Sequence, residues 1–337
     1  MKDQIIAVAA SCAVAVAASC ALAVAASCAV AARAPAAPVE SPIEAAGPVG
    51  PLRGTLLTPD GARGPVILII PGSGPTDRDG NSPAGILAAS YRLLAQGLAA
   101  HGVTSVRIDK RGMFGSTAAV ADGNAVTIPD YVADVQAWTR VIRQRTKASC
   151  IWLFGHSEGG LVAMAAAKSP DVCGLLLVAA PGRPMGEILR EQLKANAAAG
   201  PLLSQALPAI DALEAGKRVD TAGMNPALLR LFGPEVQGFL ISAFSYDPRQ
   251  LLAGYGKPVL ILQGQRDLQV SEADAQALEL ADPAATLVLL PDANHVLKSV
   301  ASDDKGANFA TYRDSSLPLA AGVVPSISDF LTSHAKH

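Results

Sequence analysis

Six short apolar runs constrain the fold of this chain more than any other feature. Each is rich in Val, Ile and Leu, is bounded mainly by Gly, Pro or a polar residue, and shows no regular alternation with polar positions. Strands buried on both faces have this pattern, and they occur in parallel sheets that are covered by helices. The runs lie at residues 65–71, 103–109, 150–155, 174–181, 257–264 and 286–291.

Segments with helical patterns separate most of these runs, at residues 86–100, 130–145, 161–168 and 271–281. Pro129 stands directly before the second segment, and proline is favoured in the first turn of a helix. The alternation of strand and helix predicts a doubly wound, mostly parallel α/β sheet. Residues 52–58, followed by an Asp-Gly turn, predict one more strand, an antiparallel one.

Residues 182–254 interrupt this alternation. They contain no strand-like run but several amphipathic helical segments, such as 187–199 and 226–232. About 70 residues are too many for a structureless loop in a compact domain. We therefore expect a helical cap, inserted over the sheet edge where ligands bind in such folds, with a core formed by residues 51–181 and 255–337.

The N-terminal segment 1–36 has the pattern of an export signal. Residues 5–32 carry no charge, consist almost entirely of small and aliphatic residues, and have a charged residue on either side. The pattern favours cleavage and a periplasmic or extracellular protein. Lipid attachment through Cys28 and an uncleaved membrane anchor both stay open. Residues 37–50, rich in Ala and Pro, are expected to form a flexible tether.

Composition excludes several functions. The net charge of -2 provides no basic field for nucleic acid, and no polybasic patch for a membrane, so we expect membrane contact only through the N-terminal segment. No glycine-rich phosphate loop and no zinc-type spacing of Cys and His occurs. Cys150 and Cys173 each lie at or next to the start of a predicted strand, so a disulfide and a pair of buried thiols are both open.

The segment 155–159, Gly-His-Ser-Glu-Gly, lies between an apolar run and a helical segment. The Gly-x-Ser-x-Gly pattern places a serine on a sharp strand-to-helix turn, where side chains at the two glycine positions would collide. The pattern alone is weak, but the strand before it and the helix after it are the context it requires. Ser157 is the candidate nucleophile.

A serine hydroxyl needs a general base, and elimination among five histidines indicates His295. His101 precedes a strand and so lies at the wrong sheet edge. His156 is directed away from the hydroxyl by the turn, and His334 and His337 lie near the chain end. His295 follows the last apolar run, at the edge where Ser157 is expected.

The base needs a carboxylate that orients its ring, and Asp267 follows the apolar run at 257–264. Asp292 is too close to His295 along the chain, and Asp247 follows no strand. The order Ser157, Asp267, His295 is the order of α/β-hydrolases.

Two backbone N–H groups are expected to hold the developing oxyanion, those of Glu158 and Ser73. Glu158 follows the nucleophile at a helix start, and Ser73 lies between two glycines after the first apolar run. Charged residues near this turn are expected to pair with one another and brace it: Asp77, Arg78, Asp79, Asp109, Lys110 and Arg111.

These motifs together resemble the α/β-hydrolase superfamily over nearly the whole chain beyond residue 50. The chain is most similar to a branch of exported bacterial serine esterases, also loosely labelled as peptidases. The matching segments are 71–81, 109–112 with Gly115-Ser116, 155–160, 264–267 and Asn294-His295, before a long C-terminal loop with Tyr312-Arg313. The resemblance implies an α/β-hydrolase fold, activity on short acyl esters, and no metal or organic cofactor.

The predicted function is hydrolysis of a small-molecule carboxylic ester through an acyl-enzyme. An exported peptidase or amidase with the same triad is an alternative, for which the cap offers acidic residues, namely Glu187, Glu191, Asp211 and Glu214. A non-catalytic binding protein and a cofactor-free haloperoxidase or lyase on the same fold are further alternatives, because fold does not determine function.

Overall fold

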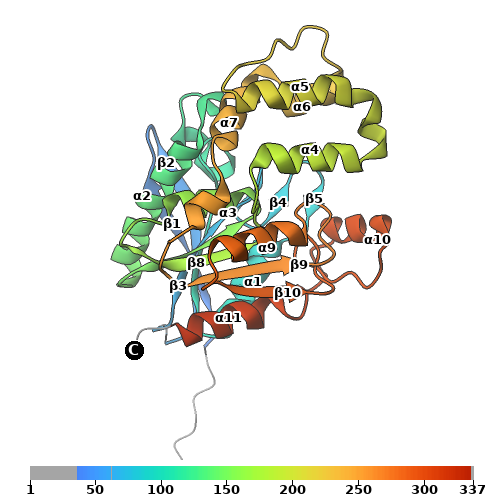
Figure 1. Cartoon of the computed structure of the whole chain (residues 1–337). Coiled ribbons are helices and arrows are strands. Elements are labelled where there is room, and N and C mark those ends of the chain that lie inside the picture. Colours follow the sequence, from blue (N-terminus) through green and yellow to red (C-terminus); the bar gives the residue numbers. More distant parts are fainter. Residues whose placement is uncertain (1–35, 62, 335–337) are drawn as a thin grey trace, which may run out of the picture. The chain divides into compact units, whose positions relative to one another are not determined.

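The computed structural model describes residues 36–61 and 63–334, and the predicted export segment falls almost entirely outside them. A sheet of eight strands runs through the described part, with helices on both faces (Figure 1). The strand order is β1-β2-β6-β3-β7-β8-β9-β10. The strands are β1 Val39–Ala46, β2 Pro51–Thr58, β3 Val66–Ile70, β6 Thr104–Ile108, β7 Ile151–His156, β8 Val172–Val178, β9 Val259–Gly264 and β10 Thr286–Leu290.

All six apolar runs form strands, and the five parallel pairs from β6 to β10 confirm the predicted α/β-hydrolase fold. β2 pairs antiparallel with β6, as expected for residues 52–58. A two-stranded hairpin, β4 Asn81–Ser82 and β5 Ile86–Leu87, follows β3.

Helices cover the sheet on both faces and form the segment above its edge. They are α1 Ser90–Ala99, α2 Ile128–Thr146, α3 Glu158–Ala166, α4 Met185–Ala195, α5 Leu203–Glu214, α6 Pro226–Phe232, α7 Pro234–Phe244, α8 Pro248–Leu252, α9 Glu272–Ala281, α10 Lys305–Ala310 and α11 Val323–Ser333. Within residues 36–61 and 63–334, none of the helices is both long and apolar enough to cross a membrane.

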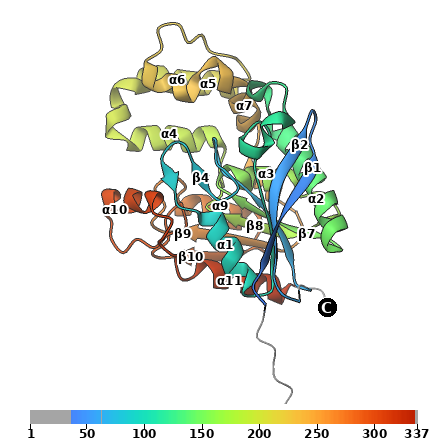
Figure 2. The same ribbon diagram turned by 180° about the vertical axis from the view of Figure 1, so that it is seen from behind.

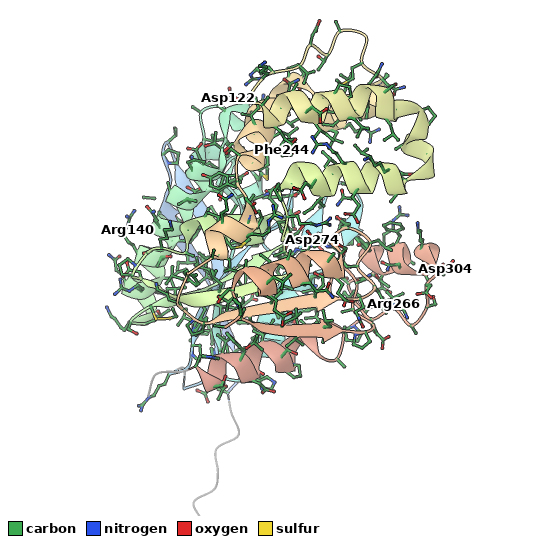
Figure 3. The ribbon with its side chains drawn as sticks, viewed as in Figure 1. Asp122, Arg140, Phe244, Arg266, Asp274 and Asp304 are labelled. Atoms are coloured by element: carbon green, nitrogen blue, oxygen red, sulfur yellow. A yellow bond between two sulfur atoms is a disulfide. The ribbon has the colours of Figure 1, made fainter. Side chains whose placement is uncertain are left out.

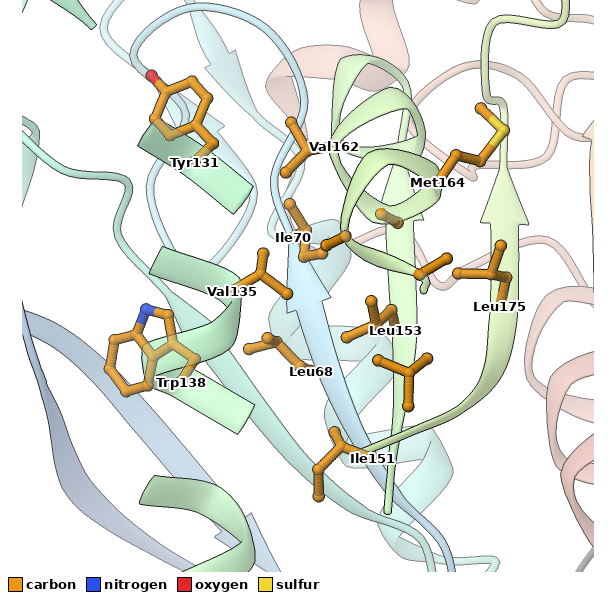
Figure 4. Close-up of a cluster of buried hydrophobic side chains, with 14 of the residues drawn as sticks. Leu68, Ile70, Tyr131, Val135, Trp138, Ile151, Leu153, Val162, Met164 and Leu175 are labelled. Carbon is orange, nitrogen blue, oxygen red and sulfur yellow. The ribbon is translucent and has the colours of Figure 1, made fainter. Parts of the chain in front are cut away.

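The strands lack alternation because both faces of the sheet are buried. In β3, Leu68 and Ile70 belong to a core cluster with residues of α2 and α3 (Figure 4). Ile67 and Ile69 belong to a second cluster, on the other face, with residues of α1 and α11. Every position of β3 is therefore apolar, since successive side chains point to opposite faces.

The expected tether over residues 37–50 is wrong for residues 39–46, which form the edge strand β1 (Figure 2). β1 pairs antiparallel with β2 along its full length. Only Ile43 and Ala45 are buried in it, so one face carries a short apolar pattern that the surrounding Ala and Pro obscure. Pro42 is tolerated because an edge strand leaves one side of its backbone unpaired.

The helices α4 to α8 lie between β8 and β9 in the chain. A cluster of buried apolar side chains from α5, α6 and α7 forms a small core within this insertion. Leu252 of α8 instead belongs to the main core. The cap therefore consists of α4 to α7 and is shorter than the expected segment 182–254. Figure 3 shows the side chains of the cap, among them Phe244, above those of the sheet edge.

Cys150 and Cys173 form a disulfide that joins the beginnings of the neighbouring strands β7 and β8. The sequence is compatible with a disulfide and with a pair of buried thiols. The parallel register brings the two Cα atoms to 5.2 Å, within the range that a disulfide requires.

Candidate active site

Ser157 occupies a strained position between β7 and α3. Its backbone angles, φ 53° and ψ -126°, belong to neither element. Such a conformation is costly for a residue with a side chain and persists where the surroundings enforce it. A Cβ atom at Gly155 would lie 2.4 Å from the carbonyl oxygen of Gly159. A Cβ atom at Gly159 would lie 2.3 Å from that of Ile70, so both positions require glycine.

His295 and Asp267 are in direct contact at the sheet edge that carries Ser157. The Nδ1 atom of His295 lies 2.7 Å from Oδ2 of Asp267, and both side chains are buried. The other oxygen of Asp267 accepts hydrogen bonds from the N–H groups of Gln269 and Val270 at 2.7 and 3.0 Å. The carboxylate is thereby fixed so that Nδ1 donates to it, and the Nε2 atom of neutral His295 is left as a proton acceptor.

The rival carboxylates lie elsewhere. Asp247 caps α8 and binds Arg249, while Asp292 is exposed in the loop after β10. Asp267 is the carboxylate that forms a hydrogen bond with His295. Ser157 and His295 both line a small cavity.

His156 connects Tyr91 with His295 through hydrogen bonds that the sequence did not indicate. Its Nδ1 atom lies 2.8 Å from the hydroxyl of Tyr91, and its Nε2 atom lies 2.8 Å from the carbonyl oxygen of His295. A carbonyl can only accept, so Nε2 carries the proton, and Nδ1 accepts from Tyr91. The Tyr91 oxygen in turn accepts from the N–H of Gly72. Burial, together with the neighbouring His295, lowers the pKa of His156 to about 3.

The turn that contains Ser73 lies directly against Ser157. A Cβ atom at Gly72 would lie 3.1 Å from Cβ of Ser157, so a larger residue there would crowd the nucleophile. Glu158 is the first residue of α3, where backbone N–H groups have no partner within the helix. Ser73, Glu158 and Ser157 line one cavity together.

Lys110 connects both predicted oxyanion segments. Its Nζ atom donates to the carbonyl oxygen of Gly72 at 2.7 Å and lies 3.5 Å from Oε1 of Glu158. The side chains of Lys110 and Glu158 are both almost fully buried. The Gly72 carbonyl and the Ser73 N–H belong to one planar peptide, so this contact also fixes the direction of the N–H.

The other charges near the turn pair only partly as expected. Asp109 accepts from the backbone N–H and from Nε of Arg78, at 2.9 and 3.0 Å. Asp79 pairs with Arg107 of β6. Arg111 instead binds α2, through Asp130 and Asp134.

A cavity of about 610 Å³ lies between the cap and the sheet edge and reaches Ser157. Its walls are mostly apolar and come from both regions, including Met113, Ile188, Leu189, Val236, Phe239, Leu240 and Phe244. Within the residues described, no group of three or more His, Cys, Asp or Glu side chains could hold a metal ion.

The chain belongs to the alpha/beta hydrolase family, whose sequence model matches residues 66–307. The esterase EstD of Thermotoga maritima is 26% identical to it over 256 residues, which are 74% of this chain and 59% of EstD. The chain thus spans less than two thirds of the length of that curated relative.

Solved structures show the same fold. The α/β-hydrolase GrgF from Penicillium sp. sh18 has a TM-score of 0.56 at 20% identity, with 88% of this chain and 99% of GrgF covered. Est1E from Butyrivibrio proteoclasticus has a TM-score of 0.54 at 17% identity, with 87% of this chain and 98% of Est1E covered.

Proposed function

We propose that this protein is a serine hydrolase that cleaves carboxylic esters through an acyl-enzyme. The observation that carries the proposal is the hydrogen bond from His295 to buried Asp267, at the sheet edge where Ser157 occupies its strained turn. The name of EstD, an esterase, is consistent with this chemistry.

In the first step, Oγ of Ser157 attacks the ester carbonyl carbon and its proton passes to Nε2 of His295. The N–H groups of Ser73 and Glu158 hold the resulting oxyanion. The bond to the alkoxy oxygen then breaks, and Nε2 returns the proton to the departing alcohol. Water attacks the acyl-enzyme by the same route, and the acid leaves as Ser157 regains its proton.

Four ion pairs weaken the case for a peptide substrate. A peptidase needs a free carboxylate to bind a charged amine, but each of the four acidic residues that the sequence suggests for this role lies within 4.0 Å of an arginine nitrogen. The pairs are Glu187–Arg249, Glu191–Arg183, Asp211–Arg190 and Glu214–Arg190. Glu235 of α7, which lines the cavity beneath the cap, is the carboxylate there that forms no ion pair among the described residues.

We also propose that the protein works outside the cytoplasm, as the pattern of residues 1–36 indicates. The disulfide between Cys150 and Cys173 agrees with this location, because such bonds persist in oxidising compartments.

The test is hydrolysis of p-nitrophenyl acetate and butyrate by the purified protein and by Ser157→Ala. We expect the variant to lose about 10³-fold or more of kcat/KM, since no other group replaces the nucleophile. Ser315→Ala, at an exposed position, is the matched control and should keep the activity. A folded wild-type protein that hydrolyses neither these esters nor methyl octanoate, or a Ser157→Ala variant as active as the wild type, contradicts the proposal.

A further inference from the structure

Ser157 lies at the boundary of two cavities that differ in size and lining. The larger one, of about 610 Å³, extends beneath the cap and has the mostly apolar walls described above. The smaller one, of about 100 Å³, is lined by Tyr91, His156, His295 and Tyr312. Ser157 and Ser73 border both cavities.

His295 borders the small cavity and is absent from the lining of the large one. Glu158 and Lys110, on the oxyanion side, border the large cavity only. The two sides of the nucleophile are therefore chemically distinct.

The proposed reaction assigns one half of the ester to each side. His295 must give its proton to the alkoxy oxygen as the carbon–oxygen bond breaks, so the alcohol has to leave on the side of His295. With the oxyanion held by the N–H groups of Ser73 and Glu158, the acyl chain is left to extend into the large cavity.

We propose that the site takes esters of a large apolar acyl group, of about eight carbons or more, with a small alcohol. This inference rests on the proposed function and replaces the expectation of short acyl chains. The small cavity has about a sixth of the volume of the large one, about 100 against 610 Å³, so it suits a small alcohol such as methanol or ethanol. The large cavity has the size of sites that bury whole drug-sized ligands.

The apolar wall also predicts how rate depends on chain length. Each methylene group buried against it can raise kcat/KM by up to about fourfold. Methyl octanoate should therefore exceed methyl butyrate by tenfold or more, whereas a site for short acyl chains would reverse that order.

The direct test compares two isomers, methyl octanoate and heptyl acetate, by titrating the acid released by the purified protein. They contain the same atoms and differ in which side of the ester is long. We expect kcat/KM to be at least tenfold higher for methyl octanoate. Equal values, or a preference for heptyl acetate, overturn the assignment of the cavities.

p-Nitrophenyl acetate separates the failure of this inference from that of the function. If hydrolysis of that ester depends on Ser157 but methyl octanoate is not preferred over heptyl acetate, the esterase proposal is supported and only the proposed substrate class is overturned. A folded protein that hydrolyses no ester overturns both.

A variant tests whether the cavity beneath the cap is the acyl site. Leu240→Trp in α7 adds volume to its wall, and should lower the ratio of kcat/KM for methyl octanoate to that for methyl butyrate by tenfold or more. Leu280→Trp in α9, at a position 81% exposed, is the matched control and should leave the ratio unchanged. An unchanged ratio in folded Leu240→Trp overturns the inference.

Discussion

Two arginines illustrate how differently the sheet edge and the cap are held together. Arg111, just beyond β6, binds Asp130 and Asp134 of α2, and its side chain is 6% exposed. Arg190 of α4 binds two carboxylates of α5, but its side chain is 23% exposed and that of its partner Asp211 is 68% exposed. The pair of Arg111 with Asp134 is thus buried, whereas both pairs of Arg190 are partly exposed to water.

This difference in burial matches the different roles that we propose for the sheet edge and the cap. The groups that carry the proposed chemistry belong to the sheet edge, where hydrogen bonds between buried groups fix Gly72, Tyr91, His156 and His295. The cap contributes apolar walls and its own small core. The region to which we assign the reaction is thus held by buried hydrogen bonds, and the region to which we assign substrate selection is held by more exposed contacts.

The largest expected effect is on stability. Arg111→Ala leaves Asp134 buried without its partner and should lower the free energy of unfolding by about 3–5 kcal/mol. Arg190→Ala removes pairs that water screens and should cost less than about 1 kcal/mol. Urea unfolding of both variants measures the contrast. Equal losses would show that the cap is held as tightly as the sheet edge.

Much of the sheet edge could be predicted from sequence because its signals are local. Ser157 is marked by glycines that a tight turn requires, and Asp267 and His295 follow apolar runs whose C-terminal ends meet at one edge. The edge strand β1 escaped prediction, since only Ile43 and Ala45 mark its buried face.

Other features depend on contacts between distant parts of the chain. Lys110 meets Gly72 across 38 positions, and Tyr91 meets His156 across 65. No local pattern indicates either partner. The sequence could not decide whether Cys150 and Cys173 form a disulfide for the same reason, because the register of β7 and β8 determines whether the two residues are close enough.

The second expected effect is on catalysis. Lys110→Met frees the Gly72 carbonyl, and with it the direction of the Ser73 N–H, so kcat should fall by about 10²-fold while KM changes little. Lys194→Met, at an exposed position of the cap, is the matched control and should stay within about twofold of the wild type.

Removal of Lys110 also leaves Glu158 without its buried cation. The double variant Lys110→Met/Glu158→Gln removes that charge and should keep the low kcat, because the Gly72 carbonyl is still unbound. Recovery of kcat in the double variant would show that the charge of Glu158, and not the orientation of the peptide, causes the loss.

The smallest expected effect, measured per pH unit, is a pH dependence of stability that originates in His156. Its pKa is about 3 in the folded state, against about 6.5 for an unperturbed histidine. Between these values the unfolded chain binds the extra proton, so the free energy of unfolding should fall as pH decreases from about 6.5 towards 3, by up to about 1.4 kcal/mol per pH unit. Tyr91, whose pKa is raised by burial, stays neutral throughout this range.

His156→Gln should flatten this part of the stability profile, because its amide can accept from Tyr91 and donate to the His295 carbonyl without titrating. His101→Gln, at an exposed turn, is the matched control and should leave the slope in place. Urea unfolding between pH 4 and pH 7 measures all three proteins. If wild type and His156→Gln show the same slope, the acid sensitivity lies elsewhere, and the buried hydrogen bonds around His156 do not set the sheet edge apart from the cap.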